Sequence, residues 1–175
     1  MRDRRFVAEH RGGPLGRDSH VVLARWAVDC AERVLPLYTC CSEDSRPKDA
    51  LDVARRWADG EVKTGAAMKA SLASHAAARQ TGNMAARAAA RAAGHAVATA
   101  HAADHSMGAL LYALKALEAS GCPSDDELQN QLAKLPEHLR EAVASGVSLR
   151  LKKLGIGRHK GPSGLRRGSA AGRAR

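Results

Sequence analysis

Aromatic residues and long apolar runs are both scarce in this sequence. Its 175 residues include two Trp, two Tyr and one Phe, so large core anchors are few, and we expect Trp26 and Trp57 to fill the widest gaps. No segment approaches the roughly 18 uncharged apolar residues that a membrane-spanning helix needs. No apolar segment of a secretory signal follows the charged N-terminus. We therefore expect a cytoplasmic protein that makes no membrane contact.

Cysteine and proline are also limited, and their positions are informative. None of the four cysteines has metal-ligand spacing, and the adjacent pair Cys40 and Cys41 is a poor candidate for an ordinary disulfide, so we expect reduced thiols. Proline is absent from residues 66–116, where 22 of 51 residues are alanine. Alanine is the best helix former, and its small side chain lets neighbouring helices approach closely. This stretch predicts closely packed helices.

The whole pattern predicts an all-α fold, a compact bundle of about six helices with alanine-rich central helices. Residues 1–17 read as an irregular lead, 18–155 as the bundle and 156–175 as a disordered basic tail rich in Gly, Arg and Lys. The fourth helix is expected to run from Asn83 to near Glu118. At about 1.5 Å per residue it would be roughly 50 Å long, so we expect a kink near Gly94 or Gly108.

The net charge of +10 is concentrated at the two ends of the chain. Residues 150–175 contain nine Lys and Arg and no acid, residues 2–17 carry +3, and residues 18–149 carry −2. The tail could bind nucleic acid weakly and without sequence preference. It has no aromatic side chain for base stacking, so only phosphate contacts are open to it.

Histidines are the main chemically active residues within the alanine-rich stretch. His101 and His105 are four residues apart, which would place both on one face of the predicted fourth helix, with His75 on the third helix. A metal ion would need a third or fourth ligand, for which His75 and Asp104 are available. The alternative is a structural or partner-binding polar cluster, which we favour. We expect no metal, no cofactor and no catalytic residue.

Several segments together resemble the Imm-five-like family of bacterial immunity proteins. They are residues 23–36, 44–57, 73–79, 92–101 and 105–115, in that order. The resemblance implies a helical protein that binds and neutralises a cognate toxin protein. It implies no catalytic residues, and Asp104 and the basic tail depart from its pattern. The residues that match its polar positions are our candidates for partner binding: Asp29, Asp44, Arg46, His75, His101 and His105.

The leading hypothesis is therefore a non-enzymatic immunity protein. The alternatives are a nucleic-acid-binding protein acting through its tail and a small metal-binding helical bundle. Immunity proteins against basic nucleases use acidic faces to speed association. A net body charge of −2 does not predict strong steering, so either the acids gather on one face or the toxin is not a basic nuclease. The acids that could gather are Asp29, Glu32, Asp44, Asp49 and Asp52.

Overall fold

The computed structural model describes residues 3–154, and every regular element in that range is a helix. Two short 3₁₀ turns, η1 (Arg4–Phe6) and η2 (Glu9–Arg11), precede eight α-helices. These are α1 (Arg17–Glu32), α2 (Pro36–Thr39), α3 (Arg46–Ala58), α4 (Thr64–Gln80), α5 (Met84–Ala98), α6 (His105–Ala119), α7 (Asp125–Ala133) and α8 (Glu137–Leu154). The all-α class is confirmed, and the predicted tail lies outside the described residues. None of these helices combines the length and apolar character that crossing a membrane requires.

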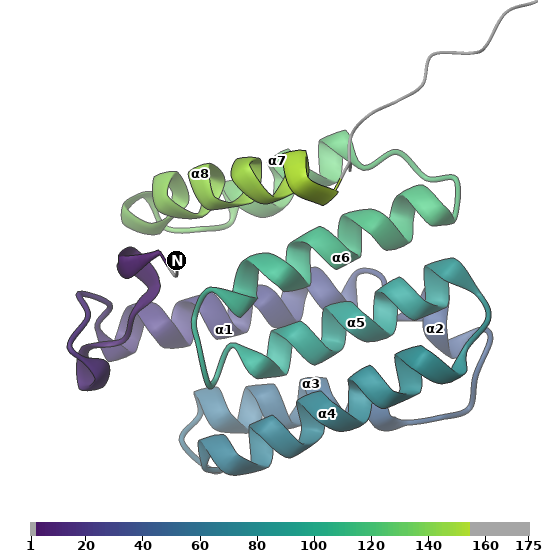
Figure 1. Cartoon of the computed structure of the whole chain (residues 1–175), viewed down its shortest axis with the longest axis horizontal. Helices are drawn as coiled ribbons and strands as arrows, with labels where there is room; N and C mark the ends of the chain where they lie inside the picture. Colours follow the sequence, from purple (N-terminus) through teal and green to yellow (C-terminus); the bar gives the residue numbers. More distant parts are fainter. Residues whose placement is uncertain (1–2, 155–175) are drawn as a thin grey trace, which may run out of the picture.

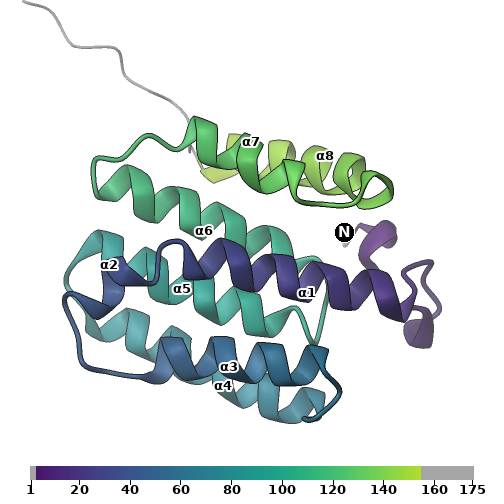
Figure 2. The same ribbon diagram turned by 180° about the vertical axis from the view of Figure 1, so that it is seen from behind.

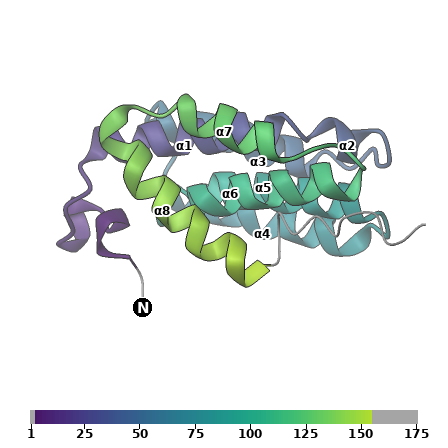
Figure 3. The same cartoon turned by 90° about the horizontal axis from the view of Figure 1, so that it is seen from above.

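The helices form two layers with a cap along one edge. Helices α4, α5 and α6 lie side by side in the layer nearest the viewer in Figure 1, and α1 and α3 lie behind them, as the reverse view in Figure 2 shows. Seen from above, α7 and α8 cover the edge of the bundle formed by α6 (Figure 3). Helix α5 is therefore central, because it has α4 and α6 on either side and α1 and α3 behind it.

Alanine makes this central position possible. Eleven of the fifteen residues of α5 are buried, and nine of them are alanine. With so little side-chain volume, the neighbouring helices pack close to the α5 backbone. Because the two backbones are close, two buried serines on α4 reach the α5 backbone. Ser71 Oγ donates to the Gly94 carbonyl at 2.9 Å, and Ser74 Oγ donates to the Ala90 carbonyl at 2.8 Å. Their hydroxyls are thus satisfied inside an apolar layer.

The larger side chains fill the remaining spaces, as the sequence predicts for both tryptophans. Trp26 is buried between α1, α6 and α7, and its indole N–H donates to the Gln131 carbonyl at 2.8 Å. Trp57 is buried at the end of α3, where its ring lies against His20, with centroids 5.0 Å apart. The Arg17 guanidinium lies 4.5 Å from the Trp57 ring centroid and shields it from solvent.

The predicted single helix from Asn83 to Glu118 is wrong. This segment forms an antiparallel hairpin of α5 and α6 joined by residues 99–104, and Gly94 and Gly108 lie inside the helices instead of at a kink (Figure 1). Helix α5 ends because a distant residue caps it: His20 Nε2 on α1 donates to the Thr99 carbonyl at 2.6 Å. The fold also buries both apolar segments, which one long helix projecting from the bundle would leave in water.

Candidate functional site

The hairpin brings together three histidines from three consecutive helices. His75 on α4, His95 on α5 and His105 on α6 form a chain of contacting rings, which we call the histidine cluster. Ring centroids are 5.1 Å apart for His75 and His95, and 5.3 Å apart for His95 and His105. The Nδ1 atoms of His95 and His105 are 3.2 Å apart, so one Nδ1 donates a hydrogen bond to the other.

Two glycines make room for these rings. A Cβ atom at Gly94 on α5 would lie 2.8 Å from Cε1 of His75, and one at Gly108 on α6 would lie 2.6 Å from Nδ1 of His95. Both distances are too short for non-bonded atoms, so each imidazole occupies space that any larger residue would take. Glycine in a helix interior costs about 0.5–1 kcal/mol relative to alanine. At Gly94 and Gly108, glycine allows a histidine ring to pack directly against the helix backbone.

The pKa values of two clustered histidines are lowered. Burial, together with the neighbouring His75, His105 and Arg91, lowers the pKa of His95 to about 3. Burial also lowers the pKa of His75. Tyr112 on α6 stacks on the His95 ring, with centroids 5.1 Å apart and planes 13° apart. A neutral imidazole offers one donor and one acceptor, so His75 and His95 can hydrogen-bond to a polar partner without carrying a charge.

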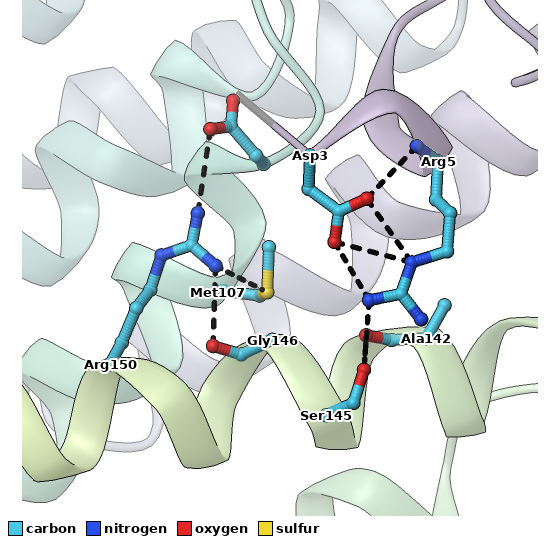
Figure 4. A network of polar contacts seen from close by, with 8 residues as sticks. Asp3, Arg5, Met107, Ala142, Ser145, Gly146 and Arg150 are labelled. Carbon is cyan, nitrogen blue, oxygen red and sulfur yellow. Dashed lines mark hydrogen bonds and ion pairs between the residues drawn. The ribbon is translucent and has the colours of Figure 1, made fainter. Parts of the chain in front are cut away.

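A pocket of about 380 Å³ opens beside the cluster, between α5, α6 and α8. Arg150 reaches it from α8, beside Met107 and Gly146 (Figure 4), and its Nη2 lies 3.5 Å from Oδ2 of Asp104. The other terminal nitrogen of Arg150 donates to the Gly146 carbonyl at 3.3 Å and contacts Met107 Sδ at 3.2 Å. The pocket is lined by His95, Asp104, His105, Gly108, Leu111, Tyr112 and Arg150.

The N-terminal segment holds α8 beside this pocket. Arg5 is fixed by an ion pair with Asp3 at 2.7 Å, and the same Nη2 atom donates to Ser145 Oγ on α8 at 2.9 Å (Figure 4). Phe6 from the same segment is buried in the cluster of apolar side chains that α8 covers. The position of Arg150 therefore depends on residues from both ends of the described chain.

The structure separates His101 from His105, which the sequence spacing predicts on one helix face. His101 lies in the turn between α5 and α6, where its Nδ1 atom is 3.4 Å from Nη2 of Arg11, whereas His105 begins α6. The two therefore do not share a helix face, and that prediction is wrong. His95 takes the place expected of His101 as the neighbour of His105.

The other candidate residues lie away from the histidine cluster. Asp29 is exposed on α1. Asp44 and Arg46 pair with each other at the start of α3, with Nε of Arg46 donating to the carboxylate at 2.9 Å, and Arg46 also donates to Gln80 at the end of α4. Hydrogen bonding to Arg46 lowers the pKa of Asp44. The pair therefore connects the start of α3 to the end of α4, and these contacts give Asp44 and Arg46 a structural role.

His95, Tyr112 and Arg150 are not among the candidate residues that the sequence predicts. The available signal was spacing across a turn: once the chain reverses at residues 99–104, residue 95 must face the first turn of α6. Residue 112 follows two turns later on the same face of that helix. Arg150 had no local signal, since α8 reaches the pocket only through tertiary packing. Within residues 3–154 no group of three or more His, Cys, Asp or Glu could hold a metal ion.

The fold is an all-α bundle, and the histidine cluster lies in the layer formed by α4, α5 and α6. A family model described as Imm-5 like putative immunity protein matches residues 13–138, and the chain belongs to this family. The match contains the three clustered histidines and Tyr112, whereas Arg150 lies beyond it. No curated protein and no solved structure matches the chain.

Proposed function

We propose that this chain is a non-enzymatic immunity protein that binds and neutralises a cognate bacterial toxin in the cytoplasm. The observation that carries the proposal is the family match over residues 13–138, which spans α1 to α7 and includes the histidine cluster. The function implied by the family's description is protection from a toxin, and the simplest means is a stable complex that covers the toxin's working surface.

Properties of the histidine cluster favour binding over acid–base catalysis. A general base works best when its pKa is close to the working pH. The pKa of His95 is about 3, so its imidazole is a weak base at neutral pH. His75 and His105 remain proposed contact residues together with His95, because all three lie in one cluster. Binding roles for Asp29, Asp44, Arg46 and His101 stay separate predictions.

Nucleic-acid binding by the basic tail also stays a prediction. The tail lies outside residues 3–154, and the family match ends before it. Such binding would be weak and steeply salt-dependent, and it would act alongside toxin binding without replacing it.

Co-expression with a toxin tests the proposal directly. Reading frames beside this gene that encode large multidomain proteins supply candidate toxins, each expressed alone and together with this chain. We expect one candidate to arrest growth, this chain to restore it, and the two purified proteins to form a complex of fixed stoichiometry. Restored growth with no complex would contradict a binding mechanism and support an enzymatic one. Arrest that this chain never relieves would contradict the immunity function.

A further inference from the structure

The outward surface of α4, α5 and α6 carries three parallel rows of side chains, which we call the basic face. Residues three or four apart in a helix share a side, and these three helices lie side by side in one layer (Figures 1 and 3). The rows are Met68, Leu72, His75 and Arg79 on α4, then Met84, Arg87, Arg91 and His95 on α5, then His105, Gly108, Tyr112 and Lys115 on α6.

This face exposes most of the large apolar side chains that reach solvent. Leu72 is 70% exposed, Met84 69% and Met68 44%, and the only other large apolar residue exposed among residues 3–151 is Leu149. Exposed apolar residues gathered on one surface mark interaction sites. Methionine, tyrosine and arginine are also the residue types enriched in protein interfaces, and all three occur in these rows.

The charge of the face is of one sign. No acidic residue occurs anywhere in residues 62–103, a stretch that contains five Lys and Arg. From the start of α4 to the end of α6, residues 64–119 carry a net charge of +3 with Asp104 and Glu118 included, although residues 18–149 as a whole carry −2. The remaining residues of the body therefore carry −5, so the bundle has a basic layer and an acidic remainder.

The distribution of ion pairs adds to the difference in charge between the basic face and the α1 and α3 side. On the α1 and α3 side, Arg25 pairs with Asp59, and Arg55 pairs with both Glu32 and Asp52. The described carboxylates form no ion pair with Arg79, Arg87 or Arg91 of the basic face. Arg87 instead donates to the Thr81 carbonyl at 2.9 Å, which fixes its side chain and leaves its charge uncompensated.

From these observations we infer that the basic face docks an acidic surface of a partner protein. The inference rests on the proposed function, in which that partner is the toxin. Tyr112 stands between two hollows of the face. The pocket beside His105 and Arg150 lies on one side, and a smaller hollow of about 140 Å³ lies on the other. The smaller hollow is lined by Met84, Arg87, Ala88, Arg91, Tyr112 and Lys115, so a carboxylate entering it meets three cations.

Two features favour a protein over a nucleic acid as the occupant. Met68, Leu72 and Met84 lie in the same rows as the cations, and a phosphate backbone offers them no apolar surface. Tyr112 is also poorly available for base stacking. His95 stacks against its ring, and the Arg91 guanidinium lies 5.6 Å from the ring centroid.

Charge reversal on the face tests the inference, with the growth-arresting toxin from the neighbouring reading frames as the probe. The test variant is Arg87→Glu with Lys115→Glu, since both side chains are exposed. The matched control is Lys48→Glu with Lys134→Glu, which reverses two exposed charges outside the face. We expect the test variant to bind the toxin at least about tenfold more weakly and the control to bind as the parent chain does. The parent's affinity should also fall as salt rises, and less steeply in the test variant.

A second variant and a second probe complete the test. Leu72→Asp changes a highly exposed side chain, so it leaves the fold intact and should weaken toxin binding. If the parent chain binds the toxin and both face variants bind equally well, the inference is wrong and the proposed function stands. If the parent chain binds no toxin, the inference and the proposed function both fail. If the full chain binds a short mixed-sequence DNA duplex tightly, and Arg87→Glu with Lys115→Glu abolishes this binding while Lys48→Glu with Lys134→Glu does not, the face is a nucleic-acid site instead.

Discussion

The imidazole of His95 occupies the position of the side chain that Gly108 lacks. A Cβ atom at residue 108 would lie 2.6 Å from His95 Nδ1 and 2.8 Å from its Cγ. The relationship joins the first turn of α6 to the last turn of α5, and it explains a glycine in a helix that otherwise has good helix formers.

Gly108→Ala should therefore destabilise the protein although it raises helix propensity. We expect the free energy of unfolding to fall by about 1–3 kcal/mol, the usual cost of overpacking. Gly65→Ala is the control, because nothing lies within 4 Å of a Cβ there. It should be neutral or stabilising by up to about 1 kcal/mol. Chemical denaturation measures both. In a His95→Ala background, Gly108→Ala should no longer destabilise, and an unchanged penalty would mean that the imidazole is not the obstacle.

Stability should fall as the pH falls below neutrality. The pKa of His95 is about 3 in the folded protein, and that of an unperturbed histidine is about 6.5. Between these values the unfolded chain binds a proton that the folded chain does not, so acidification favours unfolding. Above about pH 6.5 both states are neutral and this contribution is constant. Each pH unit lost within the window should remove up to about 1.4 kcal/mol on account of His95.

Denaturation curves at about pH 7.5, 6.5 and 5.5 measure this dependence, in a range where carboxylates contribute little. His95→Gln should reduce the slope below pH 6.5, and the exposed His10→Gln should leave it as in the parent. Equal slopes in the parent and His95→Gln would show that His95 is not held neutral by burial.

Trp57→Ala should be severely destabilising. The ring is 4% exposed, and its indole N–H donates to Thr64 Oγ1 at 3.3 Å. The core cluster that contains Trp57 is largely alanine, and alanine side chains cannot expand into the vacated space. We expect a loss of about 3–5 kcal/mol in the free energy of unfolding. Trp57→Phe should retain most of that stability, and parental stability in the alanine variant would mean that the ring adds nothing to the core.

The four thiols should react in two classes. Cys40, Cys41 and Cys122 are exposed, whereas Cys30 is buried on α1. Burial raises the pKa of the Cys30 thiol well above its usual value, which removes the reactive thiolate. Titration with a chromogenic disulfide reagent should consume three thiols quickly and the fourth only after denaturant is added. Rapid reaction of all four thiols in the native protein would contradict the burial of Cys30. A Cys30→Ser variant is the control, because its three remaining thiols should all react quickly without denaturant.

Local sequence was sufficient for the helical class and for the main core anchors. Alanine content and the lack of proline predict helices whatever their arrangement, because propensity acts within a few residues. Spacing likewise placed Trp57 on the inward side of its helix. The order of the family-like segments predicted membership correctly, since the match covers residues 13–138.

Only the tertiary structure decided where the alanine-rich stretch turns and which histidines meet. Alanine occurs on nearly every side of α5, so the sequence of this helix has no single apolar face from which its neighbours could be predicted. The end of α5 is capped by His20, which lies 79 residues earlier in the chain, and no local pattern reports such a contact. That turn replaces His101 by His95 beside His105, and it aligns three helices into one basic face. Long-range packing therefore determines the candidate site, because its side chains come from helices that are neighbours only in the folded bundle.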